Sequence, residues 1–231
     1  MILVPVKNLW QAKQRLRTVL EQSTCTELAR AMLADVLGAI AEYPGDEVGL
    51  VTSDPYAVEL GDAYRFEIIR DDTNLSETDA IRMATEVCVS RGCTSTLVVP
   101  GDVPLIEPQD LLTIYRSAPD QGSVIVPSRD KRGTNAILRR PAALFSLRFG
   151  NDSFMPHLGA AIATNTSSVV LSLPRLALDI DTPEDLEELV QAPGEKRSQR
   201  LARKLGFPSA RGAACLPEVE EGRTRPATAK M

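Results

Sequence analysis

Residues 96–105 read TLVVPGDVPL and indicate an α/β fold. The apolar run Thr96–Val99 is typical of a strand that a parallel sheet buries on both faces, and the Pro-Gly-Asp-Val-Pro sequence after it predicts a tight turn. That turn places Asp102 just beyond the carboxyl end of the strand, at the edge where open α/β sheets bind ligands. Asp102 is therefore a candidate site residue; the alternative is a turn aspartate that bonds to its own backbone.

Strands and helices alternate on both sides of this stretch. Apolar runs predict strands at Ile2–Val6, Val48–Thr52, Phe66–Ile69, Val124–Val126, Asn135–Leu138, Val169–Leu173 and Ala177–Ile180. Apolar periodicity and capping residues predict helices near Thr24–Ile40, over Tyr56–Ala63, and beginning near Ser76, Pro108, Ser153 and Thr182. The strands Val124–Val126 and Asn135–Leu138 are expected to form a hairpin. The βαβ order predicts an α/β, single-domain, Rossmann-like fold with a mostly parallel sheet.

The composition and charge exclude several classes of protein. The 231 residues, 43% of them hydrophobic, suffice for one domain with a sizeable core. A net charge of -5 argues against a broad basic surface for nucleic acid, and no apolar stretch approaches the roughly 18 residues of a membrane span. The start of the chain carries no signal-peptide pattern, so we expect a cytoplasmic protein. The cysteines lack metal-ligand spacing, and His157 is the sole histidine.

The chain changes character beyond Val190. Apolar periodicity fades there, and proline, glycine and charged residues dominate to Met231. We therefore assign residues 1–190 to the folded domain and residues 191–231 to a polar, mobile C-terminal tail.

A basic run follows the first predicted strand. Lys7, Lys13, Arg15 and Arg17 all lie shortly after its carboxyl end. Cations at this edge could neutralise the charge of a nucleotide's phosphates as pyrophosphate departs. A solvated charged face is the competing interpretation.

A second carboxylate, Asp181, also leaves a predicted strand and precedes a capped helix, with Asp179 two residues earlier. If Asp102 and Asp181 meet over one sheet edge, they form a site for a hard divalent cation such as Mg²⁺, which takes its other ligands from water and substrate phosphates. A plain helix-capping segment is the alternative.

Several polar residues are candidates for binding an anionic substrate. Gly150 and Ser153 precede a predicted helix, whose backbone N–H groups attract anions, and Thr134 and Asn135 follow Gly133 in the predicted hairpin. Helix caps and hairpin turns require the same residue types, so each signal is ambiguous by itself. Asn74 and Ser76, after the third strand, lie where a reader of the nucleotide base could sit.

Five motifs taken together resemble one family, the guanylyltransferases of coenzyme F(420) biosynthesis. They are residues 4–7 with 12–16, residues 100–105, residues 133–136, residues 148–154 and residues 179–186, in consistent order over about residues 1–190. The resemblance implies a nucleotide-diphospho-sugar-transferase-like fold, with residues 1–190 as the nucleotidyltransferase domain. It also implies transfer of GMP from GTP to phosphoenolpyruvate, 3-phospho-D-glycerate or 2-phospho-L-lactate, with release of pyrophosphate.

The family's functional residues carry over to matching positions. Asp102 and Asp181 match the metal carboxylates for Mg²⁺, and Lys13 and Arg15 match the basic loop over the nucleotide phosphates. Thr134, Gly150 and Ser153 match positions that hold the phosphorylated acid, to which we add Lys7 and Asn135 as substrate-binding candidates and Asn74 and Ser76 as nucleotide-binding candidates. The expected partners are GTP and a small phosphorylated acid, with no nucleic acid or membrane; a homodimer is compatible with the fold.

Two other interpretations stay open. The molybdenum-cofactor and sugar-phosphate nucleotidyltransferases are the runner-up enzymes, and the loop after the first strand speaks against them because it lacks their Gly-Gly turn. A catalytically silent nucleotide-binding module would keep the sheet and lose the metal, and the presence of both Asp102 and Asp181 speaks against it. The sequence does not decide which three-carbon acid is used.

Overall fold

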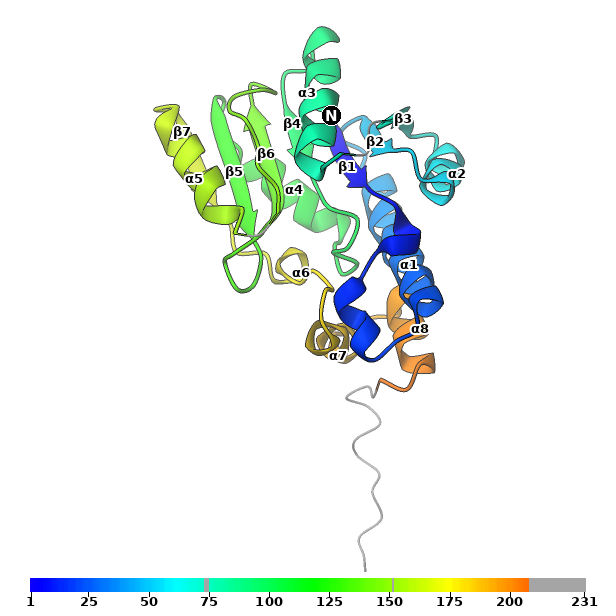
Figure 1. The fold of residues 1–231 in the computed structure, drawn as a ribbon. Coiled ribbons are helices and arrows are strands. Elements are labelled where there is room, and N and C mark those ends of the chain that lie inside the picture. The colour runs from blue at the N-terminus through cyan, green and yellow to red at the C-terminus, as the bar shows by residue number, and fades with distance from the viewer. Residues whose placement is uncertain (73–74, 151, 208–231) are drawn as a thin grey trace, which may run out of the picture.

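The computed structural model describes residues 1–72, 75–150 and 152–207. A seven-stranded sheet with the order β3-β2-β1-β4-β6-β5-β7 forms the centre of the molecule (Figure 1). Its strands are β1 (Ile2–Val6), β2 (Val48–Thr52), β3 (Glu67–Ile69), β4 (Thr96–Val98), β5 (Gly122–Pro127), β6 (Thr134–Arg140) and β7 (Ser167–Val170). The α-helices are α1 (Gln22–Ala41), α2 (Pro55–Tyr64), α3 (Glu77–Ser90), α4 (Pro108–Ser117), α5 (Phe154–Ala163), α6 (Pro174–Ala177), α7 (Pro183–Gln191) and α8 (Arg197–Lys204). Two short 3-10 helices, η1 (Leu9–Gln11) and η2 (Gln14–Thr18), follow β1.

The sheet is mostly parallel, as the alternation of strands and helices predicts. Strand β1 pairs in parallel with β2 and β4, and β2 pairs in parallel with β3. Strand β6 is the antiparallel member, paired with β4 on one side and with β5 on the other, so the expected hairpin is confirmed. Every residue of β1 and β2 is buried, which explains why both strands are mainly apolar instead of alternating between apolar and polar residues.

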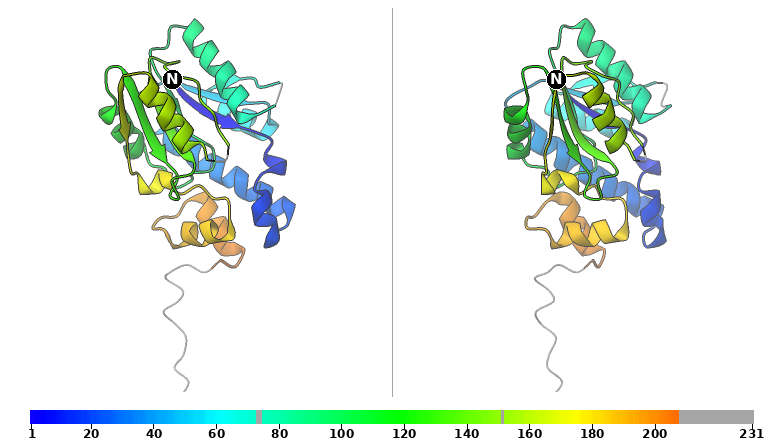
Figure 2. Two further views of the ribbon diagram at one scale, coloured as in Figure 1. Left: turned by 60° about the vertical axis from the view of Figure 1, so that its left-hand side comes forward. Right: turned by 90° about the vertical axis from the view of Figure 1, so that its left-hand side faces the viewer.

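Helices cover both faces of the sheet and create two hydrophobic cores (Figure 2). The larger core contains buried side chains of α1, α4, α7 and α8, and the smaller one contains those of α3 and α5. The fold therefore has three layers, with the carboxyl ends of β1, β2 and β4 opening at one edge. Within the described ranges, no helix is long and apolar enough to cross a lipid bilayer.

Several predicted boundaries are wrong. The expected strand Ala177–Ile180 does not form: α6 ends at Ala177, and residues 178–181 continue without regular structure. Pro174 explains the difference, because proline is favoured in the first turn of a helix. Helix α1 begins at Gln22, after Glu21, and not at Thr24.

The C-terminal segment also differs from the expected mobile tail. Residues 197–204 form α8, which packs against α1 in the larger core. Its first turn is held by the buried carboxylate of Asp35, which accepts hydrogen bonds from the backbone N–H groups of Arg197 (2.9 Å) and Ser198 (2.8 Å). The expectation of a tail beginning at residue 191 is therefore wrong for this helix, because its capping residue lies 162 positions away along the chain. Residues 208–231 lie outside the described residues.

Candidate active site

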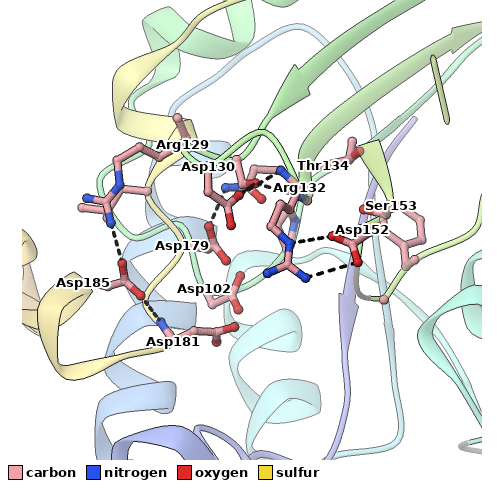
Figure 3. Close-up of a pocket in the computed structure, with 18 of the residues that line it drawn as sticks. Asp102, Arg129, Asp130, Arg132, Thr134, Asp152, Ser153, Asp179, Asp181 and Asp185 are labelled. Atoms are coloured by element: carbon pink, nitrogen blue, oxygen red, sulfur yellow. Dashed lines mark hydrogen bonds and ion pairs between the residues drawn. The ribbon is translucent and has the colours of Figure 1, made fainter. Parts of the chain in front are cut away.

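Two carboxylates meet at the edge of the sheet that the sequence singled out. Asp102 lies in the turn after β4, and Asp181 lies at the end of the irregular segment between α6 and α7. A hydrogen bond from the backbone N–H of Ile180 to the carbonyl oxygen of Asp102 (3.2 Å) ties that segment to the turn. Figure 3 shows the two side chains beside each other at the floor of a cavity. The predicted convergence of Asp102 and Asp181 is present, although a loop and not a strand delivers Asp181.

The ammonium group of Lys13 lies between these carboxylates. Its Nζ atom is 2.7 Å from Oδ2 of Asp102 and 2.9 Å from Oδ1 of Asp181, and the side chain is only 7% exposed. Burial alone would lower the pKa of Lys13, but the two carboxylates more than offset it and raise that pKa above its ordinary value. The lysine is therefore a permanent cation that binds both carboxylates at once.

The backbone at Lys13 has a conformation that non-glycine residues seldom adopt. Its φ of 57° and ψ of 42° are left-handed helical values, and the residue directly precedes η2. The fully buried Leu16 anchors η2 in the larger core. Left-handed backbone at a non-glycine residue is unfavourable and persists where the surrounding structure imposes it, often at functional sites. At Lys13, this unfavourable backbone conformation directs the side chain toward Asp102 and Asp181.

The pKa values of the two neighbouring carboxyl groups, Asp181 and Asp179, shift in opposite directions. Lys13, opposed by burial and assisted by Arg15, lowers the pKa of Asp181, whose Oδ2 lies 3.6 Å from the exposed Arg15 guanidinium. Burial, by contrast, raises the pKa of Asp179, although the Asn135 amide donates a hydrogen bond to it (3.0 Å). Asp181 is therefore the better anionic ligand for a cation, and Asp179 mainly positions Asn135.

A cavity of about 360 Å³ opens on one side of Asp102 (Figure 3). Thr134, Asn135, Gly150 and Ser153 all line it, so the structure brings together four of the five residues predicted to bind the substrate. Ser153 precedes α5 but makes no side-chain capping bond to that helix, which argues against its alternative interpretation as a plain helix cap. We call this the acid-side cavity.

A second cavity of about 510 Å³ lies on the other side and shares Glu77, Pro100 and Asp102 with the first. Lys7, Lys13 and Ser76 are among its polar lining residues, and Met32 and Leu33 are part of its apolar wall. We call it the nucleotide-side cavity, because an apolar wall next to cationic groups suits a base attached to phosphates.

Not every predicted site residue falls where it was expected. Lys7, predicted to bind the substrate, is absent from the lining of the acid-side cavity and lines the nucleotide-side cavity, where its Nζ pairs with Asp71 (2.6 Å). Ser76 lines that cavity while its hydroxyl caps α3. Arg17 lies outside both cavities, and Asn74 lies outside the described residues.

The structure adds residues that the sequence did not single out. Glu77, the first residue of α3, lines both cavities; burial, followed by the charge of Asp102, raises its pKa to about 7. Arg129 and Arg132, from the loop between β5 and β6, line the acid-side cavity, where Arg132 pairs with Asp152 (2.5 Å). Glu77 could have been identified from the sequence, because it is an acidic residue in the first turn of a predicted helix. No sequence pattern marks Arg129 and Arg132, because only the pairing of β5 with β6 brings their loop to the site.

The donor set around Lys13 fits one particular class of metal site. In the parts of the chain that the structure describes, no group of three or more His, Cys, Asp or Glu residues is arranged to hold a metal ion. Asp102 and Asp181 nonetheless hold a cation between them, the Lys13 ammonium. Two carboxylate ligands suit Mg²⁺ that arrives with a nucleotide, since phosphates and water then supply the remaining oxygens.

Comparison with solved structures places the fold. A candidate nucleotide-diphospho-sugar transferase from Desulfovibrio desulfuricans G20 superimposes with a TM-score of 0.72 at 19% identity, covering 88% of this chain and 93% of that chain. A nucleotidyl transferase from Methanothermobacter thermautotrophicus gives a TM-score of 0.58 at 15% identity, covering 88% and 97%. The fold is that of the nucleotide-diphospho-sugar transferases.

Comparison of sequences identifies the family. A phosphoenolpyruvate guanylyltransferase from Roseiflexus castenholzii is 36% identical over 203 residues, which cover 88% of this chain and 93% of that protein. A 2-phospho-L-lactate guanylyltransferase from Methanothermobacter thermautotrophicus is 31% identical over 205 residues, covering 89% and 90%. The model of the family described as "Guanylyl transferase CofC like" matches residues 1–216, and the chain therefore belongs to that family of guanylyltransferases.

Proposed function

We propose that this protein transfers GMP from GTP to a phosphorylated three-carbon acid, with release of pyrophosphate, in coenzyme F(420) biosynthesis. The observation that carries the proposal is the meeting of two cavities at Asp102, with the Lys13 ammonium at their junction. A transfer between two substrates requires two sites that open onto one reacting centre. The names of the family and of its curated relatives support the choice of a guanylyl donor and a phosphorylated acid acceptor.

The nucleotide-side cavity is the proposed GTP site. Lys7 and Lys13 reach it from the loop after β1, and its apolar wall can receive the flat face of a base. Lys13 is placed to contact the phosphates at the junction of the cavities, where negative charge builds up as pyrophosphate leaves. The exposed Arg15 lies at the same junction, within 3.6 Å of Asp181, and can turn toward those phosphates.

The acid-side cavity is the proposed acceptor site. Hydroxyl groups of Thr134 and Ser153 and the backbone at Gly150 offer neutral hydrogen-bond donors. Arg129 and Arg132 also line the cavity, where each is ion-paired with an aspartate and would have to exchange that partner for the acid. These groups would hold the acid with its phosphate toward Asp102. An oxygen of that phosphate then forms a bond to the α-phosphorus of GTP, and the bond from the α-phosphorus to the β-phosphate oxygen breaks. The phosphate nucleophile is already deprotonated near neutral pH, so no general base is required.

Magnesium is part of the proposal, with Asp102 and Asp181 as its protein ligands. Held by these residues, Mg²⁺ would supply positive charge that neutralises the leaving pyrophosphate. Both carboxylates already share one cation, and the low pKa of Asp181 keeps its side chain anionic. Glu77 lines both cavities at the same point, and its carboxylate would accept a hydrogen bond from water there.

We expect phosphoenolpyruvate to be the preferred acid, and it is the first to test. The Roseiflexus castenholzii relative named for that acid is 36% identical, against 31% for the Methanothermobacter thermautotrophicus relative named for 2-phospho-L-lactate. The acids share a phosphate and a carboxylate and differ by an enol, a methyl or a hydroxyl group, so a small change in this cavity can switch the preference.

Pyrophosphate release tests the proposal. Purified protein with GTP and Mg²⁺ is offered each of the three acids separately and then in competition, and the guanylylated product is identified by mass spectrometry. We expect release with GTP and with one acid preferred. Asp102→Asn and Asp181→Asn should each abolish most of it, whereas Asp120→Asn, at an exposed position outside both cavities, should not. Binding of GTP without release with any acid would favour the silent-module interpretation.

A further inference from the structure

His157, the only histidine of the chain, lies buried behind the wall of the acid-side cavity. It belongs to α5 and is 1% exposed, so it cannot itself touch a substrate. Its ring lies between two segments that do line the cavity: β6, which carries Thr134, and the loop that ends at Gly150. Nδ1 lies 2.9 Å from Oγ1 of Thr134, and Nε2 lies 2.9 Å from the backbone nitrogen of Arg148.

These two contacts fix the position of the ring proton. A backbone N–H group can only donate, so Nε2 must accept the hydrogen bond from Arg148 and carries no proton. A neutral imidazole has one N–H group, which must then be at Nδ1. The ring therefore donates from Nδ1 to the Thr134 hydroxyl oxygen.

The direction of the Thr134 hydroxyl proton follows from this hydrogen bond. Because Oγ1 accepts from His157, its own proton points away from the ring, and the described residues offer that hydroxyl no other side-chain hydrogen bond. Thr134 lines the acid-side cavity, so the proton is available to a ligand there. The cavity accordingly presents a hydroxyl fixed as a donor, which selects an anionic oxygen and disfavours a second donor group.

The surroundings keep the imidazole neutral. The Phe149 ring packs against it edge to face, with 5.1 Å between the ring centroids. Burial, followed by the positive charge of Arg139, lowers the pKa of His157 to about 4. A proton on Nε2 would face the backbone N–H of Arg148, so that two hydrogen-bond donors would point at each other. The hydrogen bonds from Arg148 to His157 and from His157 to Thr134 therefore persist over the pH range in which the phosphate of the acid is ionised.

We propose that His157 is a positioning residue for the acceptor: through Nδ1–H it fixes the Thr134 hydroxyl as a hydrogen-bond donor to an anionic oxygen of the phosphorylated acid. The inference rests on the proposed function, since it assigns the acid to the cavity that Thr134 lines. A neutral donor suits this task, because it orients the phosphate while withdrawing less charge from the attacking oxygen than a cation does. The same ring accepts from Arg148 and so fixes the loop that bears Gly150 against β6.

The ring proton can be observed directly. In ¹⁵N-labelled protein the single histidine contributes one pair of ring nitrogens, and two-bond couplings to the ring C–H protons distinguish Nδ1 from Nε2. We expect a protonated Nδ1 and an unprotonated Nε2 from about pH 5.5 to 8. A proton on Nε2, or a doubly protonated ring at neutral pH, would overturn the inference.

Two variants separate the two hydrogen bonds of the ring. In His157→Gln, the amide lies near the former Nε2 position, where it can accept a hydrogen bond from Arg148 but does not reach Thr134. In His157→Asn, the shorter side chain places an amide N–H near Thr134 and loses the contact with Arg148. We expect the KM for phosphoenolpyruvate to rise roughly tenfold in His157→Gln and about twofold in His157→Asn, with the KM for GTP unchanged. Thr134→Val should match His157→Gln, and Thr134→Ser, which keeps the hydroxyl, should remain close to wild type.

The double variant tests whether His157 acts through Thr134. If it does, His157→Gln combined with Thr134→Val should raise the KM for phosphoenolpyruvate no further than either change alone. A multiplied effect of roughly a hundredfold, or a His157→Gln variant that loses melting temperature but keeps its KM, would refute the positioning role.

The outcomes also separate this inference from the proposed function. An Nε2–H tautomer in a protein that releases pyrophosphate would overturn the inference and leave the activity standing. If no acid supports release from wild type, the proposed function fails, and the positioning role falls with it even where the Nδ1–H tautomer is observed.

Discussion

Replacement of Lys13 by methionine removes the ammonium from between Asp102 and Asp181 while keeping a side chain of similar length. Its Nζ makes ion pairs of 2.7 and 2.9 Å, which are buried on the lysine side but leave the side chains of Asp102 and Asp181 33% and 40% exposed. Breaking a fully buried pair costs about 3–5 kcal/mol, and water at the carboxylates reduces the expected loss of unfolding free energy to about 1–2 kcal/mol.

The loss of activity should be larger than the loss of stability. If Lys13 stabilises the charge of the leaving pyrophosphate, its removal should lower kcat by about 10²- to 10³-fold, as for other donors aimed at a transition state. The assay is GTP-dependent pyrophosphate release with phosphoenolpyruvate at saturating concentrations. Arg17→Met, in the same basic loop but outside both cavities, is the matched control and should keep its kcat.

Magnesium provides a second measurement on the same variant. Without the internal cation, Asp102 and Asp181 repel each other, so Mg²⁺ added without nucleotide should raise the melting temperature of Lys13→Met more than that of wild type. A Lys13→Met protein that folds and keeps more than about a third of the wild-type kcat would refute the role of this ammonium.

Three further predictions concern stability. Asp35→Ala should lower the unfolding free energy by about 1–3 kcal/mol in urea titrations, because the first turn of α8, including the Ser198 hydroxyl, loses its acceptor; unchanged stability would mean that α8 is not held by this cap. Arg175→Met should cost about 1–2 kcal/mol in the same assay, since it leaves the buried Asp110 without its two-bond partner, and Arg175→Lys should fall in between. For His157 the folded-state pKa of about 4 lies below the ordinary 6.5, so the unfolded chain binds more protons in that window. The contribution of the neutral His157 to the unfolding free energy should be complete above about pH 6.5 and lost as the pH falls toward 4. In urea titrations across this range, the unfolding free energy of His157→Asn should fall less steeply than that of wild type, and parallel pH dependences would contradict the lowered pKa.

Local sequence signals determined most of the regular structure. Ser76 and Thr182 cap α3 and α7 as their sequence patterns predict, because a capping hydroxyl bonds to backbone only two or three residues away. The apolar run before Pro100 predicted a buried strand for the same local reason. The failures have two causes: the local preference of Pro174 for a first helical turn produces α6 where a strand was predicted, and α8 depends on the distant Asp35.

The candidate site divides in the same way. Local patterns sufficed to predict that Asp102 follows a buried strand, that basic residues follow the first strand, and that the motifs around them resemble a guanylyltransferase family. The assembled fold was needed to show that Lys13 lies between Asp102 and Asp181, that Lys7 lines the second cavity, and that His157 lies 2.9 Å from the Thr134 hydroxyl. Residue types and turns are set by neighbours along the chain, whereas a distance between side chains 89 or 168 positions apart exists only after the sheet has assembled.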